Sequence, residues 1–263
     1  QIVRVDKESK EPMGKAQEHR LEEYLKQVLP QVRGVVLSDY GSGTITDKLL
    51  GQIFAYCQEH NIPTIVDSRY DILRFKTIDY IKQNDAELSA AIGRGLTTEE
   101  ELVQGGCELL VKMSAKGALI TRGEDGMSLF QIISPQEAAD YLKSQEVSGS
   151  GDFGQFREGL TVKLVVKRQT GRLSVVQELI SYQDRDILVS HIPVTDKSEV
   201  YDVSGAGDTC VATVILGLAA GLEPLLACQL SNEASGIAVR KMGTSVVYAR
   251  ELKARFRQLG YEA

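Results

Sequence analysis

Short apolar runs alternate with amphipathic stretches along this chain, which predicts strands followed by helices. The runs are four to seven residues long and end in polar residues, as buried parallel strands do. Strands are expected at 35–38, 62–68, 78–83, 187–193 and on both sides of a turn within 117–131. Helices are expected at 47–60, 84–92, 205–221 and 224–242, and one more is expected to begin near Thr97 or Thr98. This order predicts an α/β protein with a mainly parallel central sheet.

The segment from about residue 132 to residue 190 breaks this rhythm. Residues 134–145 have a helical pattern, residues 146–158 are rich in glycine and predict a flexible loop, and residues 160–180 alternate like a β-hairpin that turns at 169–171. We therefore expect residues 1–131 and 191–263 to form the two parts of one α/β domain, with residues 132–190 as an inserted subdomain. The insertion has no cluster of catalytic residue types, so a structural or interface role is expected for it.

Composition and charge limit the kinds of molecule that this chain is expected to bind. The chain has 263 residues, 43% of them hydrophobic, and a formal net charge of -6 without any long Lys/Arg block. Nucleic acid is therefore not an expected partner, and a phosphate site would have to come from local geometry. No apolar run approaches the ~20 residues that span a membrane. The four cysteines (57, 107, 210 and 228) lack metal-site spacing and are interpreted as reduced residues of a cytoplasmic protein.

Several candidate polar residues follow predicted strands. Asp39, Asp67, Asn84 and Thr121 each stand at or just after a strand end. Ligands of open α/β sheets bind beyond the carboxyl ends of the strands, so these residues are expected to border one cleft.

The segment GAGD, residues 205–208, stands between a predicted loop and a long apolar helix. Glycines at 205 and 207 would allow a tight turn, and amides at the start of the helix would then face outward as an anion site. A carboxylate at Asp208 could accept the proton of a hydroxyl group that attacks phosphorus. The alternative is a first-turn carboxylate that is favoured by the helix dipole and has no catalytic role.

With its flanks, VYDVSGAGDTCVATVILGLAAG closely resembles the C-terminal signature of the ribokinase-like (PfkB) carbohydrate kinases. The wider resemblance is to their D-glycero-β-D-manno-heptose 7-phosphate kinase branch. VVLSDYGSG is similar to the DYGKG segment of that branch, QNDAE to the family motif N-x-x-E, TRGEDGMSLF to its nucleotide-side turn, and SNEASGIAVRKMGTSVV to its last helix and loop. The resemblance implies a three-layer α/β/α fold.

The same resemblance implies a site. Asp208 would be the catalytic base, and Gly205, Ala206 and Gly207 would supply the anion hole. Asn84 and Glu87 would organise ATP phosphates and Mg²⁺, with Glu87 acting through water, while Thr121, Gly123, Gly126 and Asn232 would border the nucleotide. Asp39 is a candidate substrate ligand, and a monovalent cation is a further candidate cofactor. For Asn84 and Glu87, the alternative is an ordinary helix capping box.

Departures from the family pattern keep other functions open. Ser42 stands where DYGKG has lysine, Gln83 replaces a usual proline, and DSRYD replaces a DPKG-like segment. QIVRVDKES resembles a point well inside the usual chain, so the N-terminal portion with the sugar-binding motif is expected to be missing or supplied by a partner chain. The leading hypothesis is an ATP-dependent kinase of a phosphorylated sugar, and a homo-oligomer is a further candidate assembly. The alternatives are a kinase for another sugar, a non-catalytic kinase-like interaction protein and a phosphosugar-binding module.

Overall fold

The computed structural model describes residues 13–148, 152–157, 159–170, 173–197 and 200–260. These residues form one nine-stranded sheet in the order β1-β2-β3-β4-β5-β9-β8-β7-β6. The strands are β1 (Val35–Asp39), β2 (Thr64–Ser68), β3 (Tyr80–Asn84), β4 (Gly117–Thr121), β5 (Met127–Ile133), β6 (Asp152–Arg157), β7 (Leu160–Thr170), β8 (Leu173–Tyr182) and β9 (Arg185–Ile192). The α-helices are α1 (Lys15–Val28), α2 (Asp47–Glu59), α3 (Asp85–Ile92), α4 (Glu99–Met113), α5 (Pro135–Ser148), α6 (Ala206–Ala219), α7 (Pro224–Ala238) and α8 (Ala249–Gln258), with 3₁₀ turns at Leu29–Gln31, Ile72–Arg74 and Gly123–Asp125.

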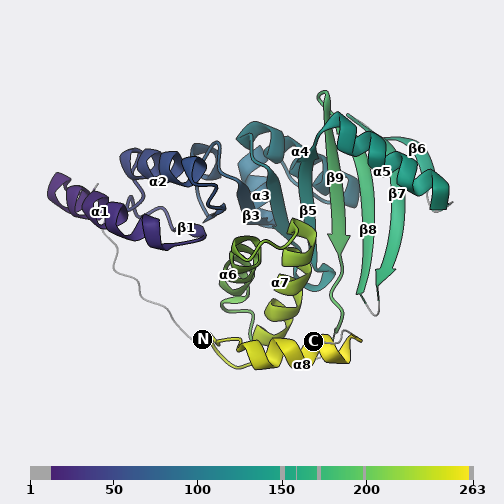
Figure 1. Cartoon of the computed structure of the whole chain (residues 1–263). Coiled ribbons are helices and arrows are strands. Elements are labelled where there is room, and N and C mark those ends of the chain that lie inside the picture. The colour runs from purple at the N-terminus through teal and green to yellow at the C-terminus, as the bar shows by residue number, and fades with distance from the viewer. Residues whose placement is uncertain (1–12, 149–151, 158, 171–172, 198–199, 261–263) are drawn as a thin grey trace.

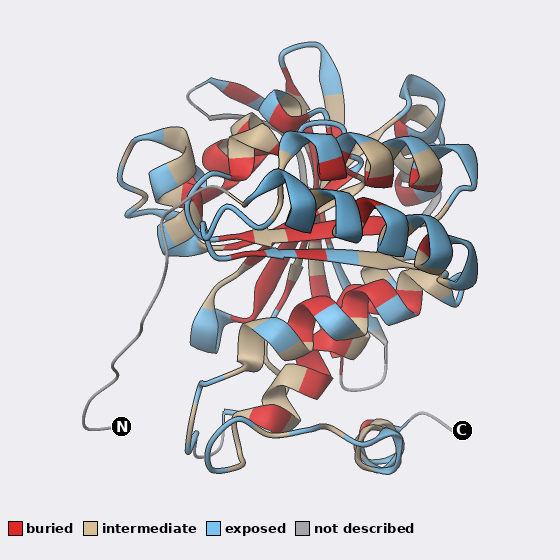
Figure 2. Ribbon diagram, turned by 90° about the vertical axis from the view of Figure 1, so that its left-hand side faces the viewer, coloured by how far each residue is buried: buried red, intermediate tan, exposed pale blue. Residues whose placement is uncertain are grey.

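Helices cover both faces of the sheet, which confirms the predicted three-layer α/β architecture (Figure 1). Helices α2, α3 and α4 contribute to one apolar core, together with the strand residues that face them. Helices α6 and α7 close the opposite face through a second core that includes Ile65, Leu119 and Val214. Figure 2 shows the buried residues concentrated along the strands and on the helix faces turned toward them. The sheet is thus shielded on both sides, as apolar parallel strands require.

The sheet is mixed, so the prediction of a mainly parallel sheet was wrong. The pairs β1–β2, β2–β3 and β3–β4 are parallel, whereas every pair from β4–β5 to β7–β6 is antiparallel. The difference arises because short connections join β4 to β5, β6 to β7, β7 to β8 and β8 to β9, and such connections allow only antiparallel neighbours. Most of these strands belong to the 132–190 segment. The strands of this segment extend the central sheet through β9 instead of forming a separate sheet.

The hairpin predicted within the segment is present as β7 and β8, although residues 171–172 of its turn lie outside the described part of the chain. The flexible loop predicted for 146–158 is partly wrong, because Asp152–Arg157 forms the edge strand β6 along β7. Helix α5 packs over this extension through Tyr141 and Leu142. The boundaries expected at 131/132 and 190/191 fall inside strands β5 and β9. The division of the chain into three parts stays a prediction.

The remaining elements agree closely with the pattern. Helix α6 begins within one residue of its predicted start, whereas α7 ends at Ala238, four residues before its predicted end at Met242. The four cysteines are buried, and none of them forms a disulfide bond with another. Within the described residues, no helix is both long enough and apolar enough to cross a membrane.

Candidate active site

A left-handed glycine starts helix α6 and leaves its first amides uncovered. Gly205 caps the helix with φ +78°, and no side chain caps the amides that follow. The amide of Ala206 donates to the carbonyl of Val203 at 3.2 Å. Among the described residues, the amides of Gly207 and Asp208 have no partner of their own. Among the described residues the Gly205 amide likewise has no partner, so Gly205, Gly207 and Asp208 are the available donors, whereas the Ala206 amide is already bonded within the turn.

Contacts from neighbouring elements hold this turn in place. The Ser235 hydroxyl of α7 donates to the carbonyl of Ala206 at 3.2 Å, and Ser231 donates to the carbonyl of Cys210. The carboxylate of Asp202 accepts the amides of Ser204 at 2.8 Å and of Gly243 at 3.1 Å. These amides hold the pKa of Asp202 below its usual range. The outward-facing amides are thus fixed before any ligand arrives, which is what an anion site requires.

Parallel pairing brings the polar strand ends together beneath α6. Asp67 of β2 lies directly opposite Lys82 of β3, and Asn84 lies opposite Thr121 of β4. Paired residues of adjacent strands point to the same face, here the face covered by α6. A cavity of about 260 Å³ opens there, and its lining includes Asp67, Lys82, Asn84, Glu87, Thr121, Gly205, Gly207 and Asp208. The expected clustering of strand-end residues is therefore present.

Asn84 and Glu87 form the helix capping box that was the alternative to a ligand site. The Asn84 side chain accepts the Glu87 amide at 2.7 Å, and Oε2 of Glu87 accepts the Asn84 amide at 2.8 Å. Both residues also line the cavity, so the cap fixes them at its wall. Capping and ligand binding are compatible in this geometry, because the cap uses only one oxygen of the Glu87 carboxylate.

Asp39 is held by the protein itself. Its carboxylate is buried, accepts the Ser68 hydroxyl at 2.8 Å and accepts the Gly41 amide at 3.1 Å. These bonds order the loop that follows β1 and explain a polar residue at this strand end without a substrate. Asp39 borders the cavity but is buried, whereas Asp208 is exposed.

Two cations in this cavity were not among the residues predicted from the sequence. Lys82 is 5% exposed, and its ammonium lies 3.0 Å from the Asp67 carboxylate. Burial raises the pKa of Asp67, and the charge of Lys82 opposes that rise. Arg69 lies at the exposed rim, with its guanidinium stacked over Tyr40 at 4.9 Å. The available signal for Lys82 was a charged residue inside an otherwise buried strand, YIKQN.

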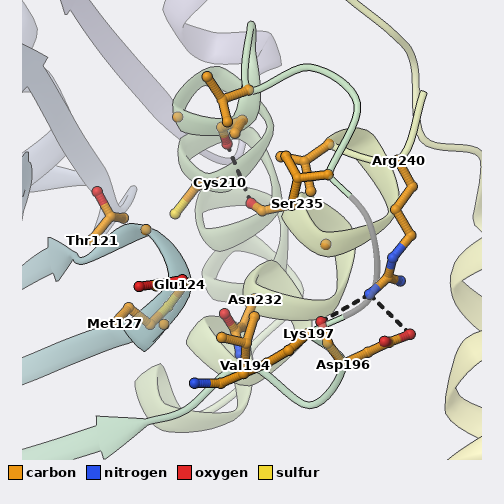
Figure 3. A pocket seen from close by; sticks show the side chains of 18 residues that line it. Thr121, Glu124, Met127, Val194, Asp196, Lys197, Cys210, Asn232, Ser235 and Arg240 are labelled. Atoms are coloured by element: carbon orange, nitrogen blue, oxygen red, sulfur yellow. Dashed lines mark hydrogen bonds and ion pairs between the residues drawn. The ribbon is translucent and has the colours of Figure 1, made fainter. Parts of the chain in front are cut away.

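A second cavity of about 410 Å³ lies on the other side of the α6 start. Thr121, Gly123 and Gly126 border it from the β4–β5 turn, and Asn232 borders it from α7. Figure 3 shows Thr121 and Met127 on the strand side, facing Asn232 and Ser235 on the helical side. The Asn232 side chain donates to the carbonyl of Pro193 at 2.8 Å and so braces the loop beneath the cavity.

Gly126 shows why the β4–β5 turn needs glycine. Its φ is +85°, and a Cβ at this position would lie 2.1 Å from the carbonyl oxygen of Ile192. Larger residues are thus excluded at the point where β5 meets β9 beside the cavity. The two cavities share Thr121, Val203 and Gly207, so the uncovered amides lie between them. This arrangement suits a group that passes from a ligand in one cavity to a ligand in the other.

Comparison with known proteins identifies the family. The family model described as pfkB family carbohydrate kinase matches residues 9–152 and 180–249. This chain belongs to that family. Residues 153–179, which the match leaves out, fall in the segment that carries β6, β7 and most of β8.

Curated relatives of the chain are considerably longer than the chain itself. The bifunctional protein HldE of Geobacter metallireducens is 31% identical over 253 residues, which cover 96% of this chain and 41% of that protein. The HldE of Hyphomonas neptunium is 32% identical over 255 residues, with 97% and 41% covered. The chain thus spans about two fifths of the length of these relatives.

Solved structures share the fold at low sequence identity. Phosphofructokinase-2 from Escherichia coli in complex with substrates and products aligns with a TM-score of 0.59 at 18% identity, covering 95% of this chain and 64% of that one. Arabidopsis thaliana ribokinase complexed with ribose and ATP aligns with a TM-score of 0.56 at 16% identity, covering 96% and 61%. These alignments confirm the predicted ribokinase-like fold.

Proposed function

We propose that this chain carries the nucleotide-binding and phosphoryl-transfer part of an ATP-dependent sugar kinase. One observation carries the proposal: the Asp208 carboxylate lies beside the uncovered amides of α6, in a cavity whose wall also holds Asn84 and Glu87. An anion site and a proton acceptor on one rigid helix turn are what phosphoryl transfer to a hydroxyl group needs.

Each cavity has a role in this proposal. The larger cavity, with Met127, Val194 and Val239 as apolar wall residues and Asn232 as a polar one, takes the nucleotide. The amides of Gly207 and Asp208 face the phosphoryl group between the cavities. The smaller, polar cavity receives the sugar hydroxyl, whose proton passes to Asp208 as the oxygen attacks phosphorus.

Magnesium fits this site only in company with the nucleotide. Among the described residues, no group of three or more His, Cys, Asp or Glu side chains is arranged to hold a metal ion by itself. Glu87 has one carboxylate oxygen outside the capping bond and would hold Mg²⁺ through water, with Asn84 alongside. The metal would neutralise charge on the ATP phosphates. A monovalent cation remains a further proposed cofactor.

Replacing Glu87 with glutamine tests the metal role. Glutamine can still accept the Asn84 amide, so the melting temperature should hardly change. The lost charge should raise the Mg²⁺ concentration for half-maximal ATP binding and turnover by about 10-fold or more. Glu101→Gln is a matched control, because Glu101 occupies the same capping-box position in α4 with Thr98. Superimposable titrations of Glu87→Gln and wild type would assign Glu87 to the helix cap alone.

The proposed acceptor is a phosphorylated sugar of the heptose 7-phosphate type. This rests on the resemblance of VVLSDYGSG and the GAGD flanks to that kinase branch, and on the HldE relatives. Because the relatives and the solved kinases extend well beyond the matched region, we propose that further sequence or a partner chain completes the sugar pocket. A homo-oligomer could serve the same purpose. The proposed location is the cytoplasm, where ATP and sugar phosphates occur.

The function is tested by measuring ADP formation with Mg²⁺-ATP and a panel of acceptors. The panel holds heptose 7-phosphate, fructose 6-phosphate and ribose, and each is tried with the chain alone and with the upstream sequence or partner supplied. Heptose 7-phosphate-dependent ADP formation supports the proposal, and a preference for another sugar corrects the substrate. ATP binding without transfer to any acceptor in either form favours a non-catalytic kinase-like protein.

A further inference from the structure

The ammonium group of Lys82 lies directly beneath the start of α6. A Cβ built on Gly207 would be 3.1 Å from Nζ of Lys82 and would have no other contact as close. The same nitrogen lies 3.0 Å from Oδ2 of Asp67 and 4.0 Å from Oε2 of Glu87. The cation therefore lies in the wall of the smaller cavity, next to the uncovered amides.

Burying this cation is costly, so its position needs an explanation. A charge taken out of water loses several kcal/mol of hydration unless partners replace it. Asp67 supplies one partner, but replacing a buried ion pair with apolar residues of similar volume is often neutral or stabilising. The strand could therefore be built without the charge, and the pair is best explained by a ligand that the charge serves.

The other groups around the cavity show what kind of ligand this is. Four carboxylates line it (Asp39, Asp67, Glu87 and Asp208), and they would repel a phosphoryl group. The only cations among the described lining residues are Arg69, at the exposed rim, and Lys82, which is buried. Of the two, only Lys82 lies beside Gly207, whose uncovered amide is part of the anion site.

We propose that Lys82 is a further catalytic residue, which binds the terminal phosphoryl group of ATP against the amides of Gly207 and Asp208. The inference rests on the proposed function. As the sugar oxygen forms its bond to the γ-phosphorus, its proton goes to Asp208. The bond from that phosphorus to the β–γ bridging oxygen breaks, and its electron pair leaves with ADP. Lys82 keeps its proton throughout and stabilises the negative charge on the transferring oxygens.

Nucleotide binding without acceptor tests this role independently of turnover. ATP and ADP affinities are measured by titration calorimetry with Mg²⁺ for wild type and Lys82→Met. Loss of a charge-assisted contact should weaken ATP binding by about 10- to 100-fold. ADP binding should change by less than about 3-fold, since ADP lacks the group that Lys82 contacts. Lys116→Met is the matched control, because that lysine is exposed and pairs with Asp79 at the opposite end of the strands.

The methionine variant leaves Asp67 buried without its partner, so a second variant separates folding from ligand binding. Lys82→Met/Asp67→Asn removes both charges and should recover the melting temperature lost by the single variant. It should not recover the preference for ATP over ADP. Restored preference in the double variant would mean that Lys82 only neutralises Asp67, and the proposal would be overturned.

The outcomes also separate this inference from the proposed function. Phosphoryl transfer by wild type with an unchanged ATP-to-ADP affinity ratio in Lys82→Met overturns the role of Lys82 and leaves the kinase function standing. Another outcome is ATP-selective binding that depends on Lys82 but no transfer to any acceptor. It supports Lys82 as the contact for the terminal phosphoryl group. It rejects the kinase function, and with it any catalytic role for Lys82. A wild-type chain that binds neither nucleotide overturns both.

Discussion

Replacing Asp208 with asparagine should lower turnover by about 10²–10⁴-fold and leave ATP affinity nearly unchanged. Asparagine has the same shape and keeps the first-turn position in α6, but it cannot take a proton from the sugar hydroxyl. The backbone N–H of residue 208 still faces the anion site, so nucleotide binding should persist. The expected signature is thus a fall in kcat at a nearly constant KM for ATP.

Asp47→Asn is the matched control for this variant. Asp47 is also a first-turn carboxylate, in α2, and its side chain is exposed and pairs with Arg74 away from the site. If Asp208 only complemented the helix dipole, both variants would cost a little stability and neither would lose turnover. Phosphoryl transfer at the wild-type rate in Asp208→Asn would remove Asp208 from the mechanism.

Valine at Gly205 or Gly207 should reduce kcat by about 10²–10³-fold, the usual cost of losing an anion-hole donor, with the circular dichroism spectrum retained. The reasons differ between the two glycines. Gly205 has φ +78°, which valine adopts only with strain, so the turn itself would change. Gly207 has ordinary helical geometry, but its new side chain would press on Nζ of Lys82 and cover the amides. Positive φ is therefore required at Gly205 and not at Gly207.

Two glycines outside the site provide controls. Gly221 has φ +83° at the far end of α6 and no atoms within 4 Å of a built Cβ, so Gly221→Val reports backbone strain alone. Gly51 lies within α2 and, like Gly221, has no atoms within 4 Å of a built Cβ. Its φ is not positive, so it is the control for Gly207, which is also a helical glycine without positive φ. Controls that lose as much activity as Gly205→Val and Gly207→Val would show that the effect is general destabilisation. Normal transfer by Gly207→Val would exclude the backbone donors.

Local pattern was sufficient for the elements that carry the site. The apolar spacing of α2, the Thr98 and Asn84 caps, and the glycine turn before α6 depend on residues within a few positions of one another. Such signals are local sequence patterns with the periodicity of a helix or a strand, and they do not depend on residues far away in the sequence. The GAGD segment and its neighbours also indicated the family, which the comparison with the family model confirmed.

Tertiary structure decided what depends on partners far apart in sequence. The strands of the 132–190 segment could be recognised as a hairpin, but only pairing of β5 with β9 shows that they extend the central sheet. Edge strand β6 has a weak pattern of its own and exists through its bonds to β7. Strand pairing across many residues is set by the assembled sheet, so local composition predicted a loop there.

The same distinction holds within the candidate site. The sequence by itself determined that Asp208 follows a glycine turn at a helix start, because that arrangement is local. Only the fold places Lys82 beside Asp67, through the β2–β3 register, and beneath Gly207, through the packing of α6 on the sheet. It also decides that the Ala206 amide is already used, because its acceptor belongs to the folded turn. Charges and donors become a site when backbone geometry brings them within hydrogen-bond distance, and that distance is a property of the tertiary structure.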